Sequence, residues 1–203
     1  MKEFWNNRYS QKEWAYGQQP NVFVKEQLPA LKPGKILFPA EGEGRNAVFA
    51  AQMGWDVSAF DYSITGKKKA LELAKLNNTQ IDYQINGFLE EDYKREYFDV
   101  VCNVFVHFEP NIKTTMHKRL DKYLKSGGIF MIEAYSKEHR AINKLNPAVG
   151  GPPDESHMYS KEEILKDFTN YDILDLNIER VNLSEGLYHV GESSVLRFIG
   201  RKK

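Results

Sequence analysis

A glycine-containing turn and an aspartate are the residues best suited to binding a ligand. The turn Ala40-Glu41-Gly42-Glu43-Gly44 follows a short apolar run, and Asp61 ends the next apolar run, 21 residues after Ala40. Small residues at every second position let a ligand approach the backbone closely. Glycine also tolerates the positive φ values that a tight turn can require. A carboxylate at the end of a second strand can accept hydrogen bonds from both hydroxyls of a ribose. Each feature alone is often structural, but together they predict a nucleoside site.

The pattern leaves two kinds of nucleoside cofactor open. Residues 42–47 satisfy Gly-x-Gly-x-x-Ala, which is typical of NAD(P) sites, and the N-terminus of the helix expected next offers free N–H groups to an anion. Glu41 and Glu43 would repel a pyrophosphate, whereas the cationic sulfonium and amino group of S-adenosylmethionine would tolerate them. We therefore favour S-adenosylmethionine. An NAD(P)-dependent reductase and a non-catalytic S-adenosylmethionine binder are the alternatives.

The elements that would position these residues alternate between strand and helix. Strands are expected at 35–38, 56–60, 81–85, 98–106 and 129–134, and helices at 45–53, 64–76 and from Pro110 towards Leu124, before Ser126-Gly127-Gly128. Repeated strand–helix–strand units indicate a parallel sheet with helices on both faces.

The last third of the chain has a different pattern. Ser160 and Glu163 have capping-box spacing, which predicts a helix from about Lys161. Only a loop joins the strand-like runs 171–181 and 194–201, so we expect them to pair antiparallel. The segment up to Leu31 should form two helical pieces outside the sheet.

Several motifs in a consistent order resemble class I S-adenosylmethionine-dependent methyltransferases. Within that class they resemble the small-molecule group that includes tellurite-resistance and thiopurine methyltransferases. The matching residues, which cover nearly the whole chain, are Trp5, Arg8, Tyr9, Tyr16-Gly17, Pro20-Asn21, Gly42 to Asn46, Phe98 to Val101, His107 to Pro110, Leu124 to Gly128, Gly150 to Pro153 and Glu185 to His189.

The resemblance implies an α/β, Rossmann-like three-layer sandwich. Its seven-stranded, mostly parallel sheet would have the order 3-2-1-4-5-7-6, with strand 7 antiparallel. Residues 1–203 would form one methyltransferase domain, made of an N-terminal helical lid (1–31), a cofactor-binding core (35–134), and substrate-side loops with antiparallel C-terminal strands (135–203).

The resemblance also implies a cofactor site for S-adenosylmethionine, with S-adenosylhomocysteine as the product. Residues 40–44 would wrap the methionine part, Asp61 would hold the ribose hydroxyls, and Tyr62 would lie against the adenine. The backbone at Asn103 and Val104 would line the methionine part. The full expected set is Ala40, Glu41, Gly42, Gly44, Arg45, Asn46, Asp61, Tyr62, Asn86, Gly87, Phe88, Asn103 and Val104.

Three positions of the expected cofactor site depart from the family pattern. Phe38 stands where many members have an acid. Ala40 stands where most members have the first glycine, and its methyl group is tolerable if φ is negative there. Gly87 stands where the family usually has an acid that accepts from the adenine amino group. Asn86 would then supply a carbonyl and Phe88 a stacking face.

The acceptor is expected to be a small molecule with a thiol, a chalcogen oxyanion or a similar soft nucleophile. A thiol or hydroxyl must lose a proton, and a base near pH 7 helps. His107 is the candidate base, although a histidine that caps the next helix or hydrogen-bonds locally is an equal interpretation. A soft anion needs no base, and Arg8, Arg45 or Arg140 would then matter more. The expected acceptor contacts are Trp5, Arg8, Tyr16, His107, Tyr159 and His189.

The composition argues against several other classes of protein, namely nucleic-acid-binding, secreted, membrane and metal-binding proteins. The chain has 203 residues, and its 28 basic and 28 acidic residues give zero net charge, so no basic footprint for nucleic acid is expected. Cys102 is the only cysteine, which fits a reducing compartment. No signal-peptide core, membrane-length apolar run or metal-ligand spacing occurs, so we expect a cytoplasmic protein without membrane or metal, as a monomer or a homodimer.

Overall fold

The computed structural model describes residues 2–90 and 92–203. The chain folds into two compact units. The first comprises the chain up to Asp92 together with Glu185–Leu187, and the second comprises Tyr93–Ser184 and Tyr188–Lys203. Each unit is described by itself, and the assignment of residues 1–203 to one domain stays a prediction.

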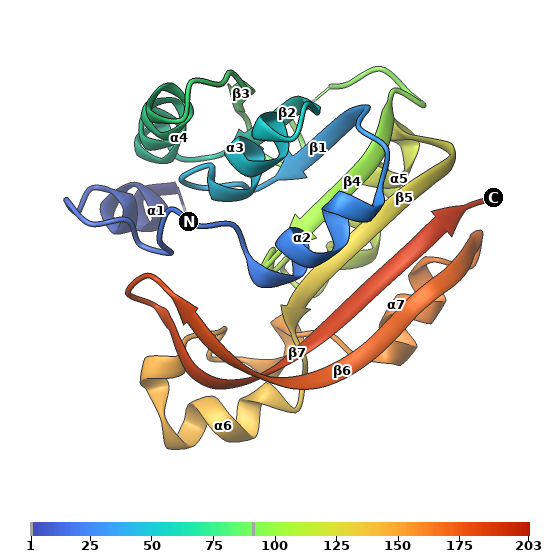
Figure 1. The fold of residues 1–203 in the computed structure, drawn as a ribbon. Helices are drawn as coiled ribbons and strands as arrows, with labels where there is room; N and C mark the ends of the chain where they lie inside the picture. Colours follow the sequence, from blue (N-terminus) through green and yellow to red (C-terminus); the bar gives the residue numbers. More distant parts are fainter. Residues whose placement is uncertain (1, 91) are drawn as a thin grey trace. The chain divides into compact units, whose positions relative to one another are not determined.

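The helices and strands are shown in Figure 1. They are α1 (Lys2–Tyr9), α2 (Val22–Gln27), β1 (Lys35–Pro39), α3 (Arg45–Gln52), β2 (Asp56–Asp61), α4 (Ile64–Leu76), β3 (Asp82–Ile85), β4 (Phe98–Val104), α5 (Lys113–Tyr123), β5 (Leu124–Tyr135), α6 (His139–Leu145), α7 (Lys161–Asp167), β6 (Tyr171–Glu185) and β7 (His189–Lys202), with short 3-10 turns at Leu28–Ala30, Pro147–Val149 and Glu155–His157.

The strand order is β3-β2-β1-β4-β5-β7-β6, as the family resemblance implies. Strand β2 pairs in parallel with β1 and with β3, and β4 pairs in parallel with β5. Strand β7 runs antiparallel to β5. The predicted fold class is therefore confirmed in its sheet order and in its antiparallel seventh strand.

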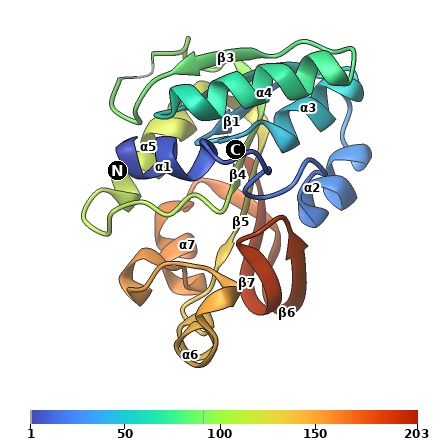
Figure 2. The same cartoon turned by 90° about the vertical axis from the view of Figure 1, so that its left-hand side faces the viewer.

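The first unit packs α3 and α4 with the strands β1 to β3 (Figure 2). The apolar run of β1 is fully buried, as expected for a strand covered on both faces. Helix α4 has the predicted bounds, because Ser63 caps it by accepting from the Gly66 N–H at 3.0 Å. A Cβ atom on Gly44 would lie 2.5 Å from the Ala70 Cβ, so a glycine at this position lets α3 start close to α4.

The second unit is built on β4, β5 and β7, and two boundaries predicted there were wrong. Helix α5 begins at Lys113 and not at Pro110, because the Glu109 carbonyl accepts from the N–H groups of both Ile112 and Lys113 and forms a turn first. Strand β5 begins at Leu124, which already pairs with Phe98, and a register shift in β4 accommodates the glycines that follow.

Local sequence patterns predicted α7 and parts of β6 and β7, but not α6. The capping box of Ser160 and Glu163 starts α7 at Lys161 as predicted. Helix α6 was not predicted, because its seven residues are too few to show a clear apolar period. Strands β6 and β7 are neighbours in the sheet and are longer than the runs that predicted them.

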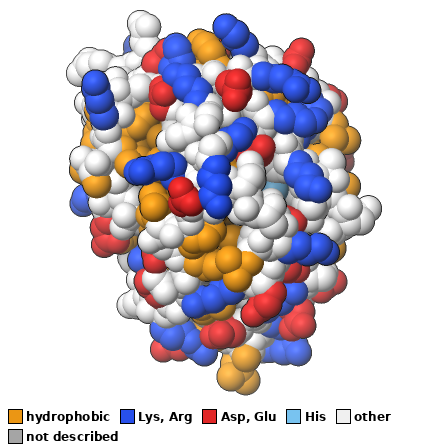
Figure 3. All heavy atoms as spheres, turned by 90° about the vertical axis from the view of Figure 1, so that its right-hand side faces the viewer, with side chains coloured by type: hydrophobic (Ala, Val, Ile, Leu, Met, Phe, Trp, Pro, Cys, Tyr) orange, Lys and Arg blue, Asp and Glu red, His pale blue; other side chains and the backbone are white. Residues whose placement is uncertain are grey.

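The surface charges are mixed. On the face in Figure 3, Lys and Arg side chains alternate with Asp and Glu side chains and with smaller apolar areas. Among the described helices, none has the length and hydropathy needed to cross a membrane.

The turn after β1 contains a strained residue. Ala40 has a φ of 48°, so the condition under which its methyl group would be tolerated without strain, a negative φ, is not met. A side chain in the left-handed region brings its Cβ close to the following carbonyl oxygen and costs roughly 1–2 kcal/mol. The methyl group of Ala40 therefore imposes a local conformational cost on the folded turn.

Replacing Ala40 by glycine should stabilise the chain. We expect the free energy of unfolding of Ala40→Gly to rise by about 0.5–1 kcal/mol, because relief of the left-handed strain exceeds the added backbone entropy of glycine. Urea unfolding measures the change. The matched control Ala51→Gly, inside α3, should instead lose about 0.5–1 kcal/mol. A loss of stability in both variants would contradict the strain at Ala40.

Candidate functional site

Glu41 closes the N-terminus of α3. Its carboxylate accepts from the N–H groups of Asn46 and Ala47, each at 2.8 Å. The prediction that this helix end offers free N–H groups to an external anion was therefore wrong for these two donors, because a carboxylate of the same turn already binds them. Burial raises the pKa of Glu41 to about 7. A dinucleotide pyrophosphate would have to displace Glu41, which weighs against the reductase alternative.

Glu43 links the turn to the N-terminal segment. Its carboxylate accepts from the Ala15 N–H at 2.8 Å and from the Lys69 ammonium at 2.7 Å. Lys69 also donates to the Glu13 carbonyl at 2.7 Å. The charge of Glu43 is thus compensated within the first unit. The expected repulsion of a pyrophosphate by Glu43 is reduced, and its structural role is to hold residues 13–15 against the turn.

Asp61 lies at the end of β2 with both carboxylate oxygens fixed. One oxygen accepts from the Gly42 N–H at 3.1 Å and the other from the Ser63 N–H at 2.8 Å. Burial raises the pKa of Asp61 to about 6. The Tyr62 backbone also donates to Asp61. A carboxylate has about four lone-pair sites, so Asp61 keeps acceptor capacity beyond its backbone donors, and ribose binding stays a prediction.

The expected adenine residues lie together, and their packing explains the missing acid. A Cβ atom on Gly87 would lie 2.5 Å from a carbon of the Tyr62 ring, so this ring fills the space of a side chain at 87. Phe88 contacts Tyr62 edge-on at 6.2 Å and Phe60 at 5.3 Å. The side-chain amide of Asn86 donates to Gln84 at 3.0 Å, which leaves its oxygen to accept. An aromatic wall with an amide beside it lies where the resemblance places the acid, and its contact with adenine stays a prediction.

The side chains of Arg45 and Asn46 hold neighbouring segments of the first unit. Arg45 forms a buried ion pair with Glu185 at 2.8 Å and donates to the Tyr16 carbonyl at 3.3 Å. Asn46 accepts from the Asn21 N–H at 2.9 Å, and the Asn21 amide donates to Glu185 at 3.0 Å. Asn21 and Glu185 were recognised only as parts of motifs, without these roles. A direct contact of Arg45 or Asn46 with a cofactor stays a prediction.

Three expected acceptor residues meet in the N-terminal segment. Arg8 donates to the Tyr16 hydroxyl at 3.0 Å, and its guanidinium lies 5.8 Å from the Trp5 ring centre. Trp5 in turn stacks on Tyr9 at 5.5 Å. A Cβ atom on Gly42 would lie 2.6 Å from the Tyr9 hydroxyl, which places Tyr9 against the glycine turn. Tyr9 was missing from the expected site, although its motif had been noted.

The carboxyl end of β4, in the second unit, has two features of a ligand site. Asn103 is 1% exposed, and neither polar atom of its side chain has a hydrogen-bond partner among the described residues. Buried polar groups without partners are rare in folded proteins and need an explanation such as an absent ligand. Phe105 has a φ of 53° while its N–H donates to the Glu133 carbonyl at 2.7 Å. Such strain often marks a functional site.

His107 presents one unpartnered nitrogen. Its Nδ1 lies 3.2 Å from the His157 carbonyl oxygen, which only accepts, so Nδ1 carries the proton and Nε2 has a lone pair. Within the described part of the chain, Nε2 is buried and has no hydrogen-bond partner. The pKa of His107 is lowered to about 3. Burial is the main cause, and the nearby His189, His157 and Lys113 contribute in the same direction. The expectation of a base near pH 7 is not met, because this imidazole is neutral and weakly basic.

An aromatic cluster surrounds Tyr135 and includes two of the expected histidines. Tyr135 stacks on His107 at 5.5 Å and on His139 at 4.1 Å. His189 contacts the Tyr135 ring edge-on at 5.6 Å, and Phe105 lies 4.8 Å from it. Tyr135 and His139 were not predicted, since nothing in the sequence distinguishes them from other residues that follow a strand.

Tyr159 lies beside this cluster in a structural position. Its side chain is almost fully buried, and its hydroxyl donates to the Val106 carbonyl at 3.0 Å. Its ring centre is 6.2 Å from that of His107. The hydroxyl of Tyr159 is therefore already engaged, and contact with an acceptor stays a prediction. No group of three or more potential metal ligands occurs in residues 2–90 and 92–203.

Comparisons with known proteins agree with this arrangement. The family described as tellurite resistance protein TehB matches residues 2–191. A probable thiol methyltransferase 2 of Arabidopsis thaliana is 26% identical over 197 residues, which cover 94% of this chain and 79% of that protein. A ubiquinone biosynthesis O-methyltransferase of Rickettsia bellii is 28% identical over 174 residues, which cover 83% of this chain and 71% of the relative.

Solved structures share the fold. TehB from Haemophilus influenzae superposes with a TM-score of 0.72 at 16% identity and covers 100% of this chain and 67% of its own. A protein solved in work on the conversion of a disulfide bond into a thioacetal group during echinomycin biosynthesis has a TM-score of 0.79 at 17% identity, with 100% and 92% covered. With the family match over most of its length, the chain belongs to the TehB family of class I S-adenosylmethionine-dependent methyltransferases.

Proposed function

We propose that this methyltransferase acts on a thiol or a similarly soft, small nucleophile, with His107 as the group that takes the acceptor's proton. The observation that carries the proposal is the buried, unpartnered Nε2 of His107 inside the aromatic cluster around Tyr135. Polarisable sulfur packs favourably against aromatic rings, which suits such an environment. The similarity to a thiol methyltransferase supports the same acceptor class.

S-adenosylmethionine, when bound, supplies a methyl group already activated on a sulfonium. The first unit fits its nucleoside part, because Asp61 keeps acceptor capacity beside Gly42 and Tyr62 provides an aromatic face next to Gly87. We assign ribose binding to Asp61 and adenine contacts to Tyr62, Phe88 and the Asn86 carbonyl. The side-chain amide of Asn103 fits a polar ligand group that can both donate and accept.

A weak base is sufficient for a thiol acceptor. When the thiol sulfur forms its new bond to the methyl group, it carries a positive charge and its S–H becomes strongly acidic. The lone pair on Nε2 of His107 then takes that proton as the charge develops. Burial keeps the imidazole neutral beforehand, so every molecule has this lone pair available at neutral pH. The protein's other contribution is to orient the acceptor and exclude water.

An anionic acceptor is the second candidate. The family is described by tellurite resistance, and a chalcogen oxyanion or thiolate would need no base. Its charge would instead need a cation, and Arg8 is held near Trp5 and Tyr16 in the first unit. Action on a small molecule in the cytoplasm belongs to the same proposal, and a sequence with a single cysteine, Cys102, forms no intramolecular disulfide, which agrees with a reducing compartment.

Asp61 should make cofactor affinity depend on pH. The ribose hydroxyls donate to the carboxylate and favour its charged form, so affinity should increase as pH rises through the pKa of about 6. We expect the Kd for S-adenosylhomocysteine to be about ten-fold lower at pH 7 than at pH 5, because about nine-tenths of the carboxyl is protonated one pH unit below its pKa. Isothermal titration calorimetry across this range measures the effect.

The variant Asp61→Asn separates this effect from other titrations, including that of Glu41. It should bind S-adenosylhomocysteine about 1–3 kcal/mol more weakly at pH 7 and lose the ten-fold dependence. Unchanged affinity together with the same pH dependence in Asp61→Asn would rule out the ribose assignment.

Removing the lone pair of His107 should impair turnover without impairing cofactor binding. In His107→Gln we expect kcat/KM for thiols to fall at least about 100-fold, while the Kd for S-adenosylhomocysteine stays the same. The control His157→Gln keeps the backbone carbonyl that binds His107 and should retain activity. A panel of thiols, selenite and tellurite distinguishes the acceptors, since anions should be methylated equally well by His107→Gln. Full thiol turnover in His107→Gln would refute the proposed proton acceptor.

A further inference from the structure

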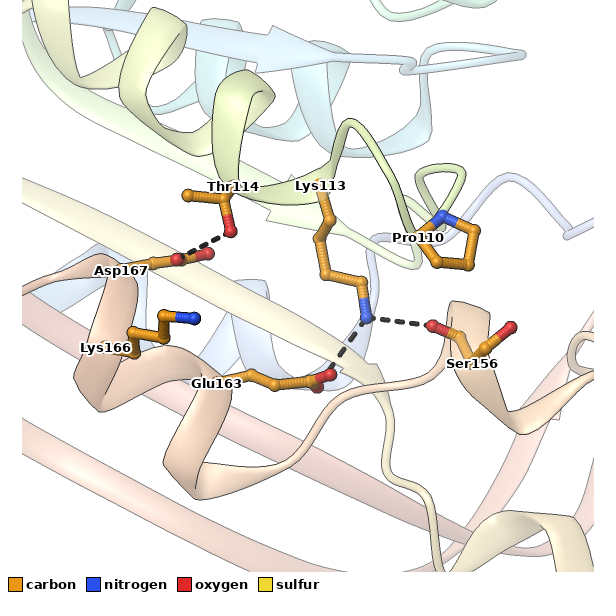
Figure 4. Close-up of a pocket in the computed structure, with 7 residues that line it drawn as sticks. All are labelled: Pro110, Lys113, Thr114, Ser156, Glu163, Lys166 and Asp167. Atoms are coloured by element: carbon orange, nitrogen blue, oxygen red, sulfur yellow. Dashed lines mark hydrogen bonds and ion pairs between the residues drawn. The ribbon is translucent and has the colours of Figure 1, made fainter.

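Lys113 is a buried lysine at the start of α5 whose ammonium group reaches a neighbouring loop. It donates to the Met158 carbonyl at 2.7 Å and to the Ser156 carbonyl at 3.2 Å. Its third contact is the carboxylate of Glu163, at 3.6 Å. Figure 4 shows Lys113 pointing from α5 towards Ser156 and Glu163 across a cavity of about 150 Å³. A buried ammonium needs such partners, because burial without them is costly.

The two carbonyls that bind Lys113 flank the residue whose carbonyl binds the histidine. Ser156 and Met158 surround His157, and the His157 carbonyl lies 3.2 Å from Nδ1 of His107. One ammonium group therefore restrains the two peptide units, 156–157 and 158–159, that flank the unit carrying the His157 carbonyl. This restraint fixes the direction of the His157 carbonyl, and the hydrogen bond from Nδ1 leaves the lone pair on Nε2.

Lys113 also contacts the aromatic residues beside His107. Its ammonium lies 4.5 Å from the centre of the Tyr159 ring, and Tyr159 donates its hydroxyl to the Val106 carbonyl one residue before His107. The charged groups near Lys113 are Glu163, Asp167 and Lys137, and those near His107 are His189, His157 and Lys113 itself. The positive charge of Lys113 lowers the pKa of His107, which helps to keep the lone pair on Nε2 unprotonated.

We propose that Lys113 is a positioning residue that selects the tautomer of His107 by holding the 156–158 loop, and that it thereby sets the rate of proton removal from the acceptor. The inference rests on the proposed role of His107. It assigns Lys113 no contact with the cofactor or the acceptor. Lys113 donates to two backbone carbonyls, whereas an ordinary ion pair with Glu163 would need only the carboxylate.

The tautomer can be measured without any turnover. Long-range ¹H–¹⁵N spectra of histidine-labelled protein, with His107 assigned from the His107→Gln variant, report which ring nitrogen carries the proton. We expect the Nδ1–H tautomer in the native chain and a mixture of both tautomers in Lys113→Met, which keeps an unbranched side chain but donates to neither carbonyl. Lys113→Arg should restore the native signals, because a guanidinium can donate to both carbonyls.

A matched control is available in the same cavity. Lys166 lines this cavity from α7 and is not among the donors to the 156–158 loop, so Lys166→Met removes the same charge and should leave the tautomer unchanged. For thiol acceptors we expect kcat to fall about ten-fold in Lys113→Met at an unchanged KM for S-adenosylmethionine, and to recover in Lys113→Arg. If Lys113→Met does not fold, Lys113→Gln serves instead, since its amide can still bind one of the carbonyls.

The His107 tautomer tests the positioning role of Lys113, and thiol turnover tests the proposed function of His107. An unchanged His107 tautomer in Lys113→Met, or an equal change in Lys166→Met, overturns the positioning role of Lys113. A shifted tautomer with unchanged thiol turnover in both Lys113→Met and His107→Gln upholds the loop restraint and overturns the proton-accepting role on which the rate effect depends.

Discussion

Three buried or half-buried carboxylates around one turn determine what the first unit can bind. Glu41, Glu43 and Asp61 each accept from backbone N–H groups, and all three lie on or beside the turn at Gly42. Hydrogen bonds to a carboxylate favour its charged form, whereas burial disfavours it, and the raised pKa values of Glu41 and Asp61 show that burial is the larger effect. The turn is thus preorganised, and the N–H groups of Asn46 and Ala47 that could bind an external anion are already bound to Glu41.

This constraint explains features that look unrelated in the sequence. The left-handed Ala40 is tolerated because the hydrogen bonds on either side of it determine the path of the turn. The N-terminal segment is held to the same turn through Ala15 and through Tyr9 over Gly42. A change in this turn would therefore affect the position of the residues expected to cover an acceptor, and not only the cofactor.

The strands and helices were largely predictable, whereas the functions of individual side chains were not. Continuous apolar runs locate β1 and β4 because buried parallel strands require them, and the Ser160–Glu163 spacing locates α7 because its capping bonds are local. The roles of Arg45 and Glu185 depend on a contact across 140 residues, which no local pattern encodes. Likewise, the φ of Ala40 and the ring of Tyr62 over Gly87 follow from packing around the turn.

The weakness of His107 as a base is consistent with the thiol acceptor that we propose. A cofactor that carries an activated methyl group makes a thiol proton acidic only as the new bond forms, so a strong base is unnecessary and a protonated imidazole would be harmful. A buried imidazole with Nδ1 bound to a carbonyl meets this requirement, because it is neutral at physiological pH and has its lone pair on one defined nitrogen. Under this proposal, the structural demand moves from the pKa of His107 to the direction of its hydrogen bond with the His157 carbonyl, and that direction is what we assign to Lys113.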